Sequence, residues 1–278
     1  MSEKPGNSGG WPSRPTRVQL LVTCLVDSIA PRVGFAVVEV LERLGLEVEV
    51  PAGQTCCGQP AFNSGGWDEA RAMARHLVDV FGDHPDVPVV VPSGSCGDMV
   101  IHQAPMLLEN DPQYADRARA LAARTFEFTQ FLVDVLGVTD VGAISEGKIA
   151  YHPSCHGLRG LGVASQPLAL LGSVRNIETC PLPEAETCCG FGGLFAVKLS
   201  DVSASLLQRK LANVEASGAD TLVATDISCL MHMEGGLRRR GSTIRVRHLA
   251  EVLADRLSPG GQQPDRRAPG AAAAEDRA

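Results

Sequence analysis

The chain is organised around the sequence Thr187-Cys188-Cys189-Gly190-Phe191-Gly192-Gly193, which has a counterpart earlier in the same chain. The counterpart is Thr55-Cys56-Cys57-Gly58-Gln59-Pro60, so that Thr-Cys-Cys-Gly occurs twice. Two copies of so specific a motif in 278 residues indicate an internal duplication.

One cysteine precedes each cysteine pair and another follows it, at nearly the same spacing in both copies. The first set is Cys24, Cys56, Cys57 and Cys96, and the second is Cys155, Cys188, Cys189 and Cys229. Matching cysteines are 131, 132, 132 and 133 residues apart. A duplication that keeps four thiols in register is typical of a metal or cluster site, so these eight cysteines are the predicted ligands.

Glycines follow both cysteine pairs. Neighbouring side chains on a regular strand point to opposite faces, so two adjacent cysteines reach one bound group only from a turn. Gly58 and Gly190 allow the positive φ of such a turn and bring backbone N–H groups towards sulfur. Gly192 and Gly193 let the second loop enclose its ligand closely. These four glycines are the predicted cofactor-binding residues.

Three further stretches surround the second set of cysteines. They are Tyr151-His152-Pro153-Ser154-Cys155-His156-Gly157-Leu158-Arg159, Cys188-Cys189-Gly190-Phe191-Gly192-Gly193-Leu194-Phe195-Ala196-Val197-Lys198 and Ser228-Cys229-Leu230-Met231-His232. With these residues the chain resembles the cysteine-rich CCG domain family, whose domain occurs twice in the cysteine-rich subunit of heterodisulfide reductase and in the iron-sulfur subunit of glycolate oxidase. Within that family it is most similar to the lactate-utilisation protein A family. The resemblance spans residues 17–257 and is more specific in the second half.

The resemblance implies one iron-sulfur cluster in each repeat. The full family pattern ends in Cys-x-x-Cys, whereas here the earlier position is Ser93 in the first repeat and Asp226 in the second. Four thiolates suffice for a [4Fe-4S] cubane, and the choice between a cubane and the non-cubane cluster of the reductase stays open.

Two other interpretations of the cysteines are weaker. Zinc is disfavoured because zinc sites usually contain Cys-x-x-Cys, which this chain lacks. Buried structural cysteines would not explain two matching sets of four. Cys180 has no counterpart in the first repeat and is interpreted as an ordinary buried thiol.

The resemblance also implies a function and partners. It implies an electron-transfer subunit of a multi-subunit complex that oxidises L-lactate to pyruvate, with companion subunits that include a ferredoxin-type iron-sulfur protein. The alternatives are the iron-sulfur subunit of a glycolate or other 2-hydroxy-acid oxidase, and heterodisulfide-reductase-like disulfide chemistry, which the missing fifth cysteine weakens. The chain has no dinucleotide or phosphate-binding motif, so we expect an oxidoreductase subunit rather than a self-sufficient enzyme.

Histidines surround only the second set of cysteines. The candidate catalytic residues are His152, His156, Arg159 and His232. The matching positions of the three histidines in the first repeat are Leu21, Leu25 and Met99. Histidine titrates near neutrality, and Arg159 and Lys198 add positive charge that favours a carboxylate. We therefore expect the second site to face the substrate or the electron donor, and the first to serve as relay or scaffold.

Composition excludes several other classes of function. The net charge of −7 and the lack of a basic stripe beyond Arg238-Arg239-Arg240 argue against a nucleic-acid partner. No apolar run approaches the 18 residues or so of a membrane span. The polar start of the chain does not resemble a signal peptide, so the nine cysteines indicate a reducing, cytoplasmic location.

The order of apolar segments predicts an α/β fold of two tandem, pseudo-twofold-related CCG domains, each a small, mostly parallel sheet with flanking helices. The predicted strands cover residues 18–22, 46–50, 87–91, 148–152, 176–178 and 221–225, and the main helices cover 32–44, 68–81, 166–171 and 200–218. A short helix near 132–136 and its counterpart near 249–253 close the halves. The predicted divisions are a disordered leader at 1–16, domains at 17–140 and 141–257, and a disordered tail at 258–278. Loops at the carboxyl ends of the strands would carry the cysteines.

Overall fold

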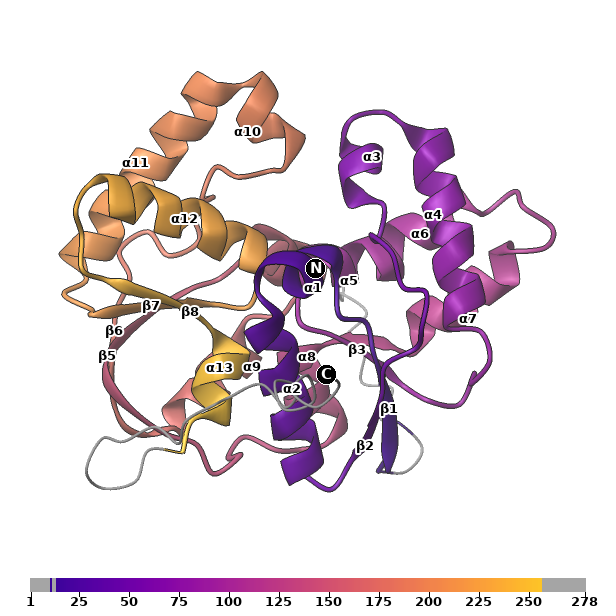
Figure 1. Cartoon of the computed structure of the whole chain (residues 1–278), viewed down its shortest axis with the longest axis horizontal. Helices are drawn as coiled ribbons and strands as arrows, with labels where there is room; N and C mark the ends of the chain where they lie inside the picture. The colour runs from indigo at the N-terminus through magenta and orange to yellow at the C-terminus, as the bar shows by residue number, and fades with distance from the viewer. Residues whose placement is uncertain (1–10, 12–13, 257–278) are drawn as a thin grey trace, which may run out of the picture.

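The computed structural model describes residue 11 and residues 14–256, and these residues form two four-stranded sheets (Figure 1). The first sheet has the order β2-β1-β3-β4 and the second the order β6-β5-β7-β8, with every described pair parallel. The strands are β1 Arg17–Leu20, β2 Glu47–Glu49, β3 Val89–Val91, β4 Thr125–Glu127, β5 Ile144–His152, β6 Arg175–Cys180, β7 Thr221–Ala224 and β8 Arg245–His248. The predicted α/β class with two repeated domains of parallel sheet is confirmed.

Helices and single π-helical turns, labelled η, connect the strands. Those of the first half are α1 Cys24–Ile29, α2 Pro31–Arg43, α3 Gln59–Asn63, α4 Trp67–Val80, α5 Gly94–Asp98, η1 Met99–Gln103, α6 Ala104–Leu107, α7 Ala115–Ala123, α8 Phe128–Gln130 and η2 Phe131–Val135. Those of the second half are η3 His156–Gly160, α9 Ser165–Gly172, α10 Leu194–Lys198, α11 Ser200–Ala216, α12 Ile227–Arg239 and α13 Leu249–Ala254.

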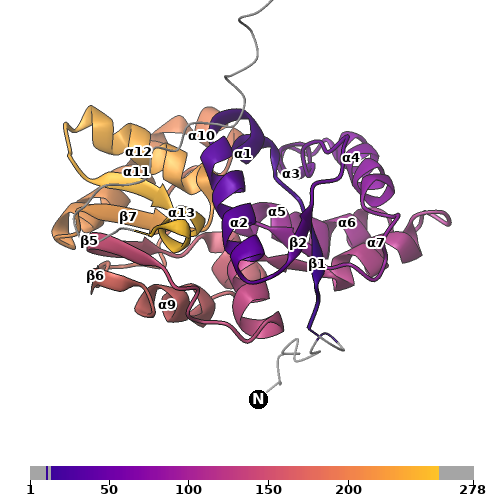
Figure 2. The same ribbon diagram turned by 60° about the horizontal axis from the view of Figure 1, so that its bottom comes forward.

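A layer of helices lies between the two sheets. Helices α2 and α13 occupy this position in Figures 1 and 2, and α9 and η2 contribute to the same core. Their buried side chains, such as Val37, Leu132 and Leu253, form one core cluster with Val90 of the first sheet and Val223 of the second. Because both sheets pack on the same helices, the two halves share a hydrophobic core.

The outer face of each sheet has its own covering of helices. Successive strand residues point to opposite faces, so Leu222 and Ala224 face away from Val223 and pack with α11 and α12. Val89 and Val91 of the first sheet pack in the same way with α4 and α7. Each sheet is therefore covered on both faces, as the fully buried strands β3 and β7 require.

Helix contacts reveal the symmetry of the repeat. Helix α2 of the first half packs against α13 of the second half. The equivalent helices, α9 of the second half and α8 of the first, also pack against each other. Exchange of contacts between equivalent elements is the mark of a twofold relation. The predicted division at 140/141 falls in the connection between η2 and β5, and the domain bounds stay a prediction because the core crosses them.

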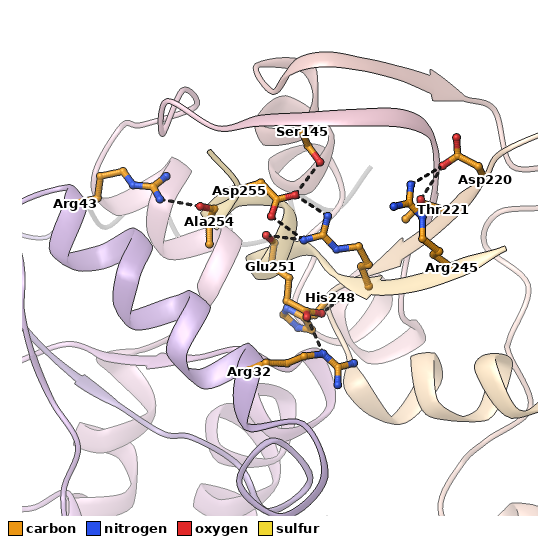
Figure 3. A network of polar contacts seen from close by, with 11 residues as sticks. Arg32, Arg43, Ser145, Asp220, Thr221, Arg245, His248, Glu251, Ala254 and Asp255 are labelled. Atoms are coloured by element: carbon orange, nitrogen blue, oxygen red, sulfur yellow. Dashed lines mark hydrogen bonds and ion pairs between the residues drawn. The ribbon is translucent and has the colours of Figure 1, made fainter. Parts of the chain in front are cut away.

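Polar contacts add to the joint between the halves (Figure 3). Arg32 Nε donates to Glu251 Oε1 at 2.7 Å, and Arg43 donates to the carbonyl oxygens of Leu253 and Ala254 at 3.0 and 2.9 Å. Glu251 also accepts from the His248 backbone N–H at 2.8 Å and so completes a capping box at the start of α13. The first half thus holds both ends of the last helix of the second half.

Some predicted elements differ from the structure. The fourth strand of each half, β4 and β8, was not predicted, nor was helix α12. The helix predicted over 200–218 is α11, which begins at Ser200 as predicted and ends at Ala216, and its N-cap Leu199 makes no side-chain cap. Most of the predicted leader and all of the predicted tail lie outside the described residues, although Trp11 packs edge-on against Phe126 with centroids 6.2 Å apart.

Candidate metal centre

One cavity of about 260 Å³ between the two halves is lined by all eight predicted ligand cysteines. The cavity lies at the carboxyl ends of β1, β3, β5 and β7, where a parallel α/β sheet places its ligands. No disulfide forms among the nine cysteines, all of which lie in the described part of the chain. The structure therefore brings the two sets of four together on opposite walls of one space.

The lone cysteines lie in the first turns of helices, not in the loops that the sequence predicted. Cys24 is the first residue of α1, while Cys96 lies within α5 and Cys229 within α12. The N-cap residues explain the difference, since Ser93 Oγ accepts from the Cys96 N–H at 3.2 Å and Asp226 Oδ1 accepts from the Ser228 N–H at 3.1 Å. Because Ser93 and Asp226 follow β3 and β7 so closely, α5 and α12 begin before Cys96 and Cys229 in the sequence.

The two Cys-Cys-Gly turns have the same backbone conformation. Gly58 and Gly190 both have a φ of +91°, and each donates its N–H to the first sulfur of its pair. For Gly190 the distance from N to Cys188 Sγ is 3.3 Å. The N–H groups of the next residues, Gln59 and Phe191, face the second sulfur in the same way. Each turn thus offers two sulfurs and two amide donors to the cavity.

The thiols of each set form a hydrogen-bonded chain. Cys24 and Cys57 each donate a hydrogen bond to Cys56, which lowers the pKa of Cys56. The same hydrogen bonds raise the pKa of Cys24 and of Cys57. Hydrogen bonds from Cys155 and Cys189 lower the pKa of Cys188 in the same way, with the pKa of both donors raised. One thiolate is stable in each set, and a cation is needed before the others lose their protons.

This chemistry fits a metal ion or an iron-sulfur cluster. Four sulfurs converge in each set, and amide donors stabilise their negative charge. Histidine adds to the second set, because ligand atoms of His152, Cys189 and Cys229 all lie within 4.8 Å of one another. The two sets therefore differ in donor type although their cysteines match.

His152 is completely buried behind the second set. Its ring approaches the Ala185 backbone, but neither ring nitrogen makes a hydrogen bond of ordinary geometry in the described part of the chain. Burial lowers the pKa of His152 to about 4, and the Lys210 charge lowers it further, so the ring is neutral near pH 7. Lys210 is itself fully buried and donates to the carbonyl oxygens of Glu184 and Ala185, both at 2.9 Å.

The two halves meet through Asp98 at the edge of the cavity. Its carboxylate, 5% exposed, accepts from His156 Nδ1 and His102 Nδ1, both at 2.7 Å. Burial alone would raise the pKa of Asp98, but the hydrogen bonds from His156 and His102 lower it overall. The same hydrogen bond raises the pKa of His156. Because His156 lines the cavity, its ring joins the first half to the second at the candidate site.

The remaining candidates lie farther from the sulfurs. The His232 ring lies against Phe191 with centroids 5.7 Å apart and the rings tilted by 60°, and burial lowers the pKa of His232. Arg159 donates to the Glu186 carbonyl at 3.1 Å outside the cavity lining, and Lys198, the last residue of α10, lines a separate hollow. Cys180 is half-buried at the end of β6.

A backbone contact brings the halves together near the axis. A Cβ on Gly94 would lie 2.7 Å from Gly157 N and 2.8 Å from Ser154 Oγ, so only glycine fits there. The symmetry-related positions are Val26 and Ile227, which lie in one apolar cluster. The halves therefore meet through closely packed glycine backbone at one of these two equivalent places, and through apolar side chains at the other.

Sequence reasoning missed Asp98, Lys210 and the contact between Ser93 and Asp226. Each of these residues contacts a residue far away in the sequence, so no local sequence pattern identifies it. Lys210 had one signal, since it is the only lysine on a helix face otherwise formed by Leu207, Leu211 and Val214. A charge on an apolar face points to a buried partner.

The family model of the cysteine-rich domain matches residues 18–101 and 149–234. The lactate utilization protein A of Exiguobacterium sp. is 49% identical over 236 residues, which cover 85% of this chain and 96% of that protein. The protein of the same name from Bacillus pumilus is 47% identical over 240 residues, covering 86% of this chain and 100% of the relative.

Among solved structures, a putative Asp/Glu racemase from Yersinia pestis is 12% identical with a TM-score of 0.35, and the match covers 86% of this chain and 96% of that one. Across the described part of the chain, no helix combines the length and apolar character that crossing a bilayer requires. From its identity with these relatives and its two matches to the domain model, the chain belongs to the lactate utilization protein A family and contains the cysteine-rich CCG domain twice.

Proposed function

We propose that this protein is a cytoplasmic iron-sulfur subunit that transfers electrons in a complex oxidising L-lactate to pyruvate. The observation that carries the proposal is the single cavity into which both sets of four cysteines point. Relatives that share nearly half of its residues over almost their full length carry the name lactate utilization protein A.

Each set would hold one [4Fe-4S] cluster. Cys24, Cys56, Cys57 and Cys96 would bind the first, and Cys155, Cys188, Cys189 and Cys229 the second. When bound, such clusters accept and release single electrons. The residues of the chain supply the surroundings: Gly58 and Gly190 donate N–H groups to the thiolates, and the shared cavity keeps the two sites close enough to exchange charge.

Oxidation of lactate also releases protons, and His156 has the position to receive one. Its ring lines the cavity, and Asp98 holds its Nδ1 proton, which leaves Nε2 as the free acceptor. His152 is fully buried, so it cannot exchange protons directly with a substrate in the cavity. For the companion subunits of the complex we propose that they include a ferredoxin-type iron-sulfur protein.

Metal analysis tests the cofactor. Protein purified without oxygen should be brown and contain iron and acid-labile sulfide, and the variants Cys57→Ala and Cys189→Ala should each lose about half of the iron. A colourless preparation with stoichiometric zinc would reject the cluster.

Growth tests the substrate. A strain without this chain should fail on L-lactate but grow on glucose, and the wild-type chain should restore growth where the Cys57→Ala/Cys189→Ala double variant does not. Normal growth on L-lactate with failure on glycolate would instead assign the chain to a glycolate-oxidising complex.

A further inference from the structure

The second site contains a buried side chain, His152, that would have no role if only its four cysteines bound the metal. The His152 side chain is 0% exposed, and both of its nitrogens lack hydrogen bonds of ordinary geometry. A buried imidazole without partners costs about 1–3 kcal/mol, so an uncompensated ring at this position is unfavourable. A bound metal would compensate for it.

The geometry supplies the candidate partners of the ring. A ring nitrogen of His152 and the sulfurs of Cys189 and Cys229 all lie within 4.8 Å of one another. Ligand atoms around one metal have this mutual separation, because Fe or Zn lies about 2.0–2.3 Å from each nitrogen or sulfur ligand. Within the residues that the structure describes, no other group of three or more such side chains comes so close.

The first site lacks this feature. Its position equivalent to His152 is Leu21, which packs in the apolar cluster behind the first sheet. Lys210, buried near the second set, has no charged equivalent there either, because Leu77 and Val78 of α4 fill that region. The duplication therefore kept the cysteines and changed the donor behind them.

Asp226 does not fill the position of a fifth ligand. Both of its carboxylate oxygens are engaged, Oδ2 by Ser93 Oγ and the Ser95 N–H, and Oδ1 by the Ser228 N–H. The side chain caps α12 and is thus directed to hydrogen-bond donors rather than to sulfur. Asp226 is therefore not available as an additional donor to the second site, whereas the histidine at the end of β5 is.

We infer that His152 is a nitrogen ligand of the second site, where it shares a metal atom with Cys189 and Cys229, whereas the first site has no histidine donor. The inference rests on the proposed function for the identity of the metal, while the donor set rests on the geometry. The imidazole replaces a negatively charged thiolate with a neutral donor. The second site therefore carries one charge fewer than a five-thiolate site would, and it differs electronically from the first.

Pulsed electron paramagnetic resonance on the reduced full-length protein tests the inference. Histidine labelled with ¹⁵N identifies nitrogen bonded to iron, and the Cys56→Ser/Cys57→Ser background removes the first site from the spectrum. We expect the strong coupling of a directly bonded nitrogen, retained in His232→Gln and lost in His152→Leu. His232 is the matched control because it lies beside the same site, with Nε2 also unpartnered. A spectrum without directly bonded nitrogen, or a coupling that survives in His152→Leu, would overturn the inference.

Cadmium separates the two proposals. If the protein binds no iron, the proposed function fails, and ¹¹³Cd²⁺ alone then probes the donor set of the full chain by nuclear magnetic resonance. One of the two resonances should show scalar coupling to ¹⁵N-histidine and should lose it in His152→Leu. Two resonances without nitrogen coupling would overturn the ligand assignment even if iron loading succeeds. The wild-type measurement decides the matter alone if the leucine variant does not fold.

Discussion

Ser93 Oγ donates to Asp226 Oδ2 at 3.2 Å, and these two residues occupy the same position of the two repeats. A residue can contact its own counterpart only at a twofold axis, so this hydrogen bond marks the pseudo-twofold axis of the molecule. Both side chains are 2% exposed. Each lies three residues before the last cysteine of its set, so the joint between the halves forms directly beside both candidate metal sites.

Removal of the Asp226 carboxylate should destabilise the protein strongly. Asp226→Ala leaves the partly buried N–H groups of Ser95 and Ser228 without an acceptor, which should cost about 2–4 kcal/mol in the free energy of unfolding. Ser93→Ala should cost about 1 kcal/mol through its lost cap. Urea unfolding of both single variants and the double variant measures the coupling, and strict additivity would contradict a direct bond between the two side chains.

The two turn glycines should respond unequally to alanine. Both have a φ of +91°, which costs an L-residue about 1–2 kcal/mol. A Cβ on Gly190 would also lie 2.6 Å from the Ser203 carbonyl oxygen, whereas on Gly58 the nearest atom is Met73 Cβ at 3.3 Å. Gly190→Ala should therefore lose more stability and more bound metal than Gly58→Ala, as measured by urea unfolding and metal per chain. Equal losses would show that the backbone conformation alone sets the cost.

Burial of Glu127 should make stability fall as pH rises. Its side chain is 0% exposed and caps α8, and desolvation raises its pKa from 4.5 to about 7. The folded state thus keeps a proton that the unfolded state releases, so stability decreases between about pH 4.5 and 7 and levels off above that. The shift corresponds to roughly 3 kcal/mol.

Glu127→Gln should flatten this dependence, because the amide keeps an acceptor for the Thr129 N–H without a titrating proton. Urea midpoints of both proteins between pH 5 and 8 provide the comparison. Parallel curves for the wild type and the variant would show that Glu127 does not titrate in this range.

Lys210 should hold the loop before the second cysteine pair in place. Lys210→Met removes two hydrogen bonds to the carbonyl oxygens of Glu184 and Ala185, at about 2–3 kcal/mol. Hydrogen exchange should speed up in residues 184–190. Arg209→Met is the matched control, since it removes an exposed ion pair to the same Glu184 and should cost less than about 1 kcal/mol. If hydrogen exchange in residues 184–190 is equally fast in both variants, the exposed ion pair between Arg209 and Glu184 orders the loop as much as Lys210 does.

The sequence predicted the parts of this structure that repeat locally. The matching spacing of the cysteines and the buried strands placed both sets at the carboxyl ends of parallel strands. Strand β4 was missed because it has only three residues, and β8 because Arg245 and Arg247 alternate with its apolar positions. Both strands pair only at a sheet edge, where register depends on the neighbouring strand.

The contacts across the axis could not be predicted. Asp98 follows Cys96 by two residues and looks like any acid in the first turns of a helix, yet its partner His156 is 58 residues away. Only the arrangement of the two halves brings them together. In the same way, His152 has the pattern of an ordinary strand residue until Cys189 and Cys229 are placed beside it.

The close approach of Gly94 to Gly157 has an evolutionary consequence. A single repeat would expose the apolar helices that now pack between the sheets, so such a repeat on its own would need to pair with an identical copy. In a homodimer the contact occurs twice with identical residues, and neither copy can change alone. Fusion of the two genes removed that constraint, since one copy is now a glycine pair and the other is Val26 with Ile227. The asymmetry between the two sites is thus a property that only the fused gene could acquire.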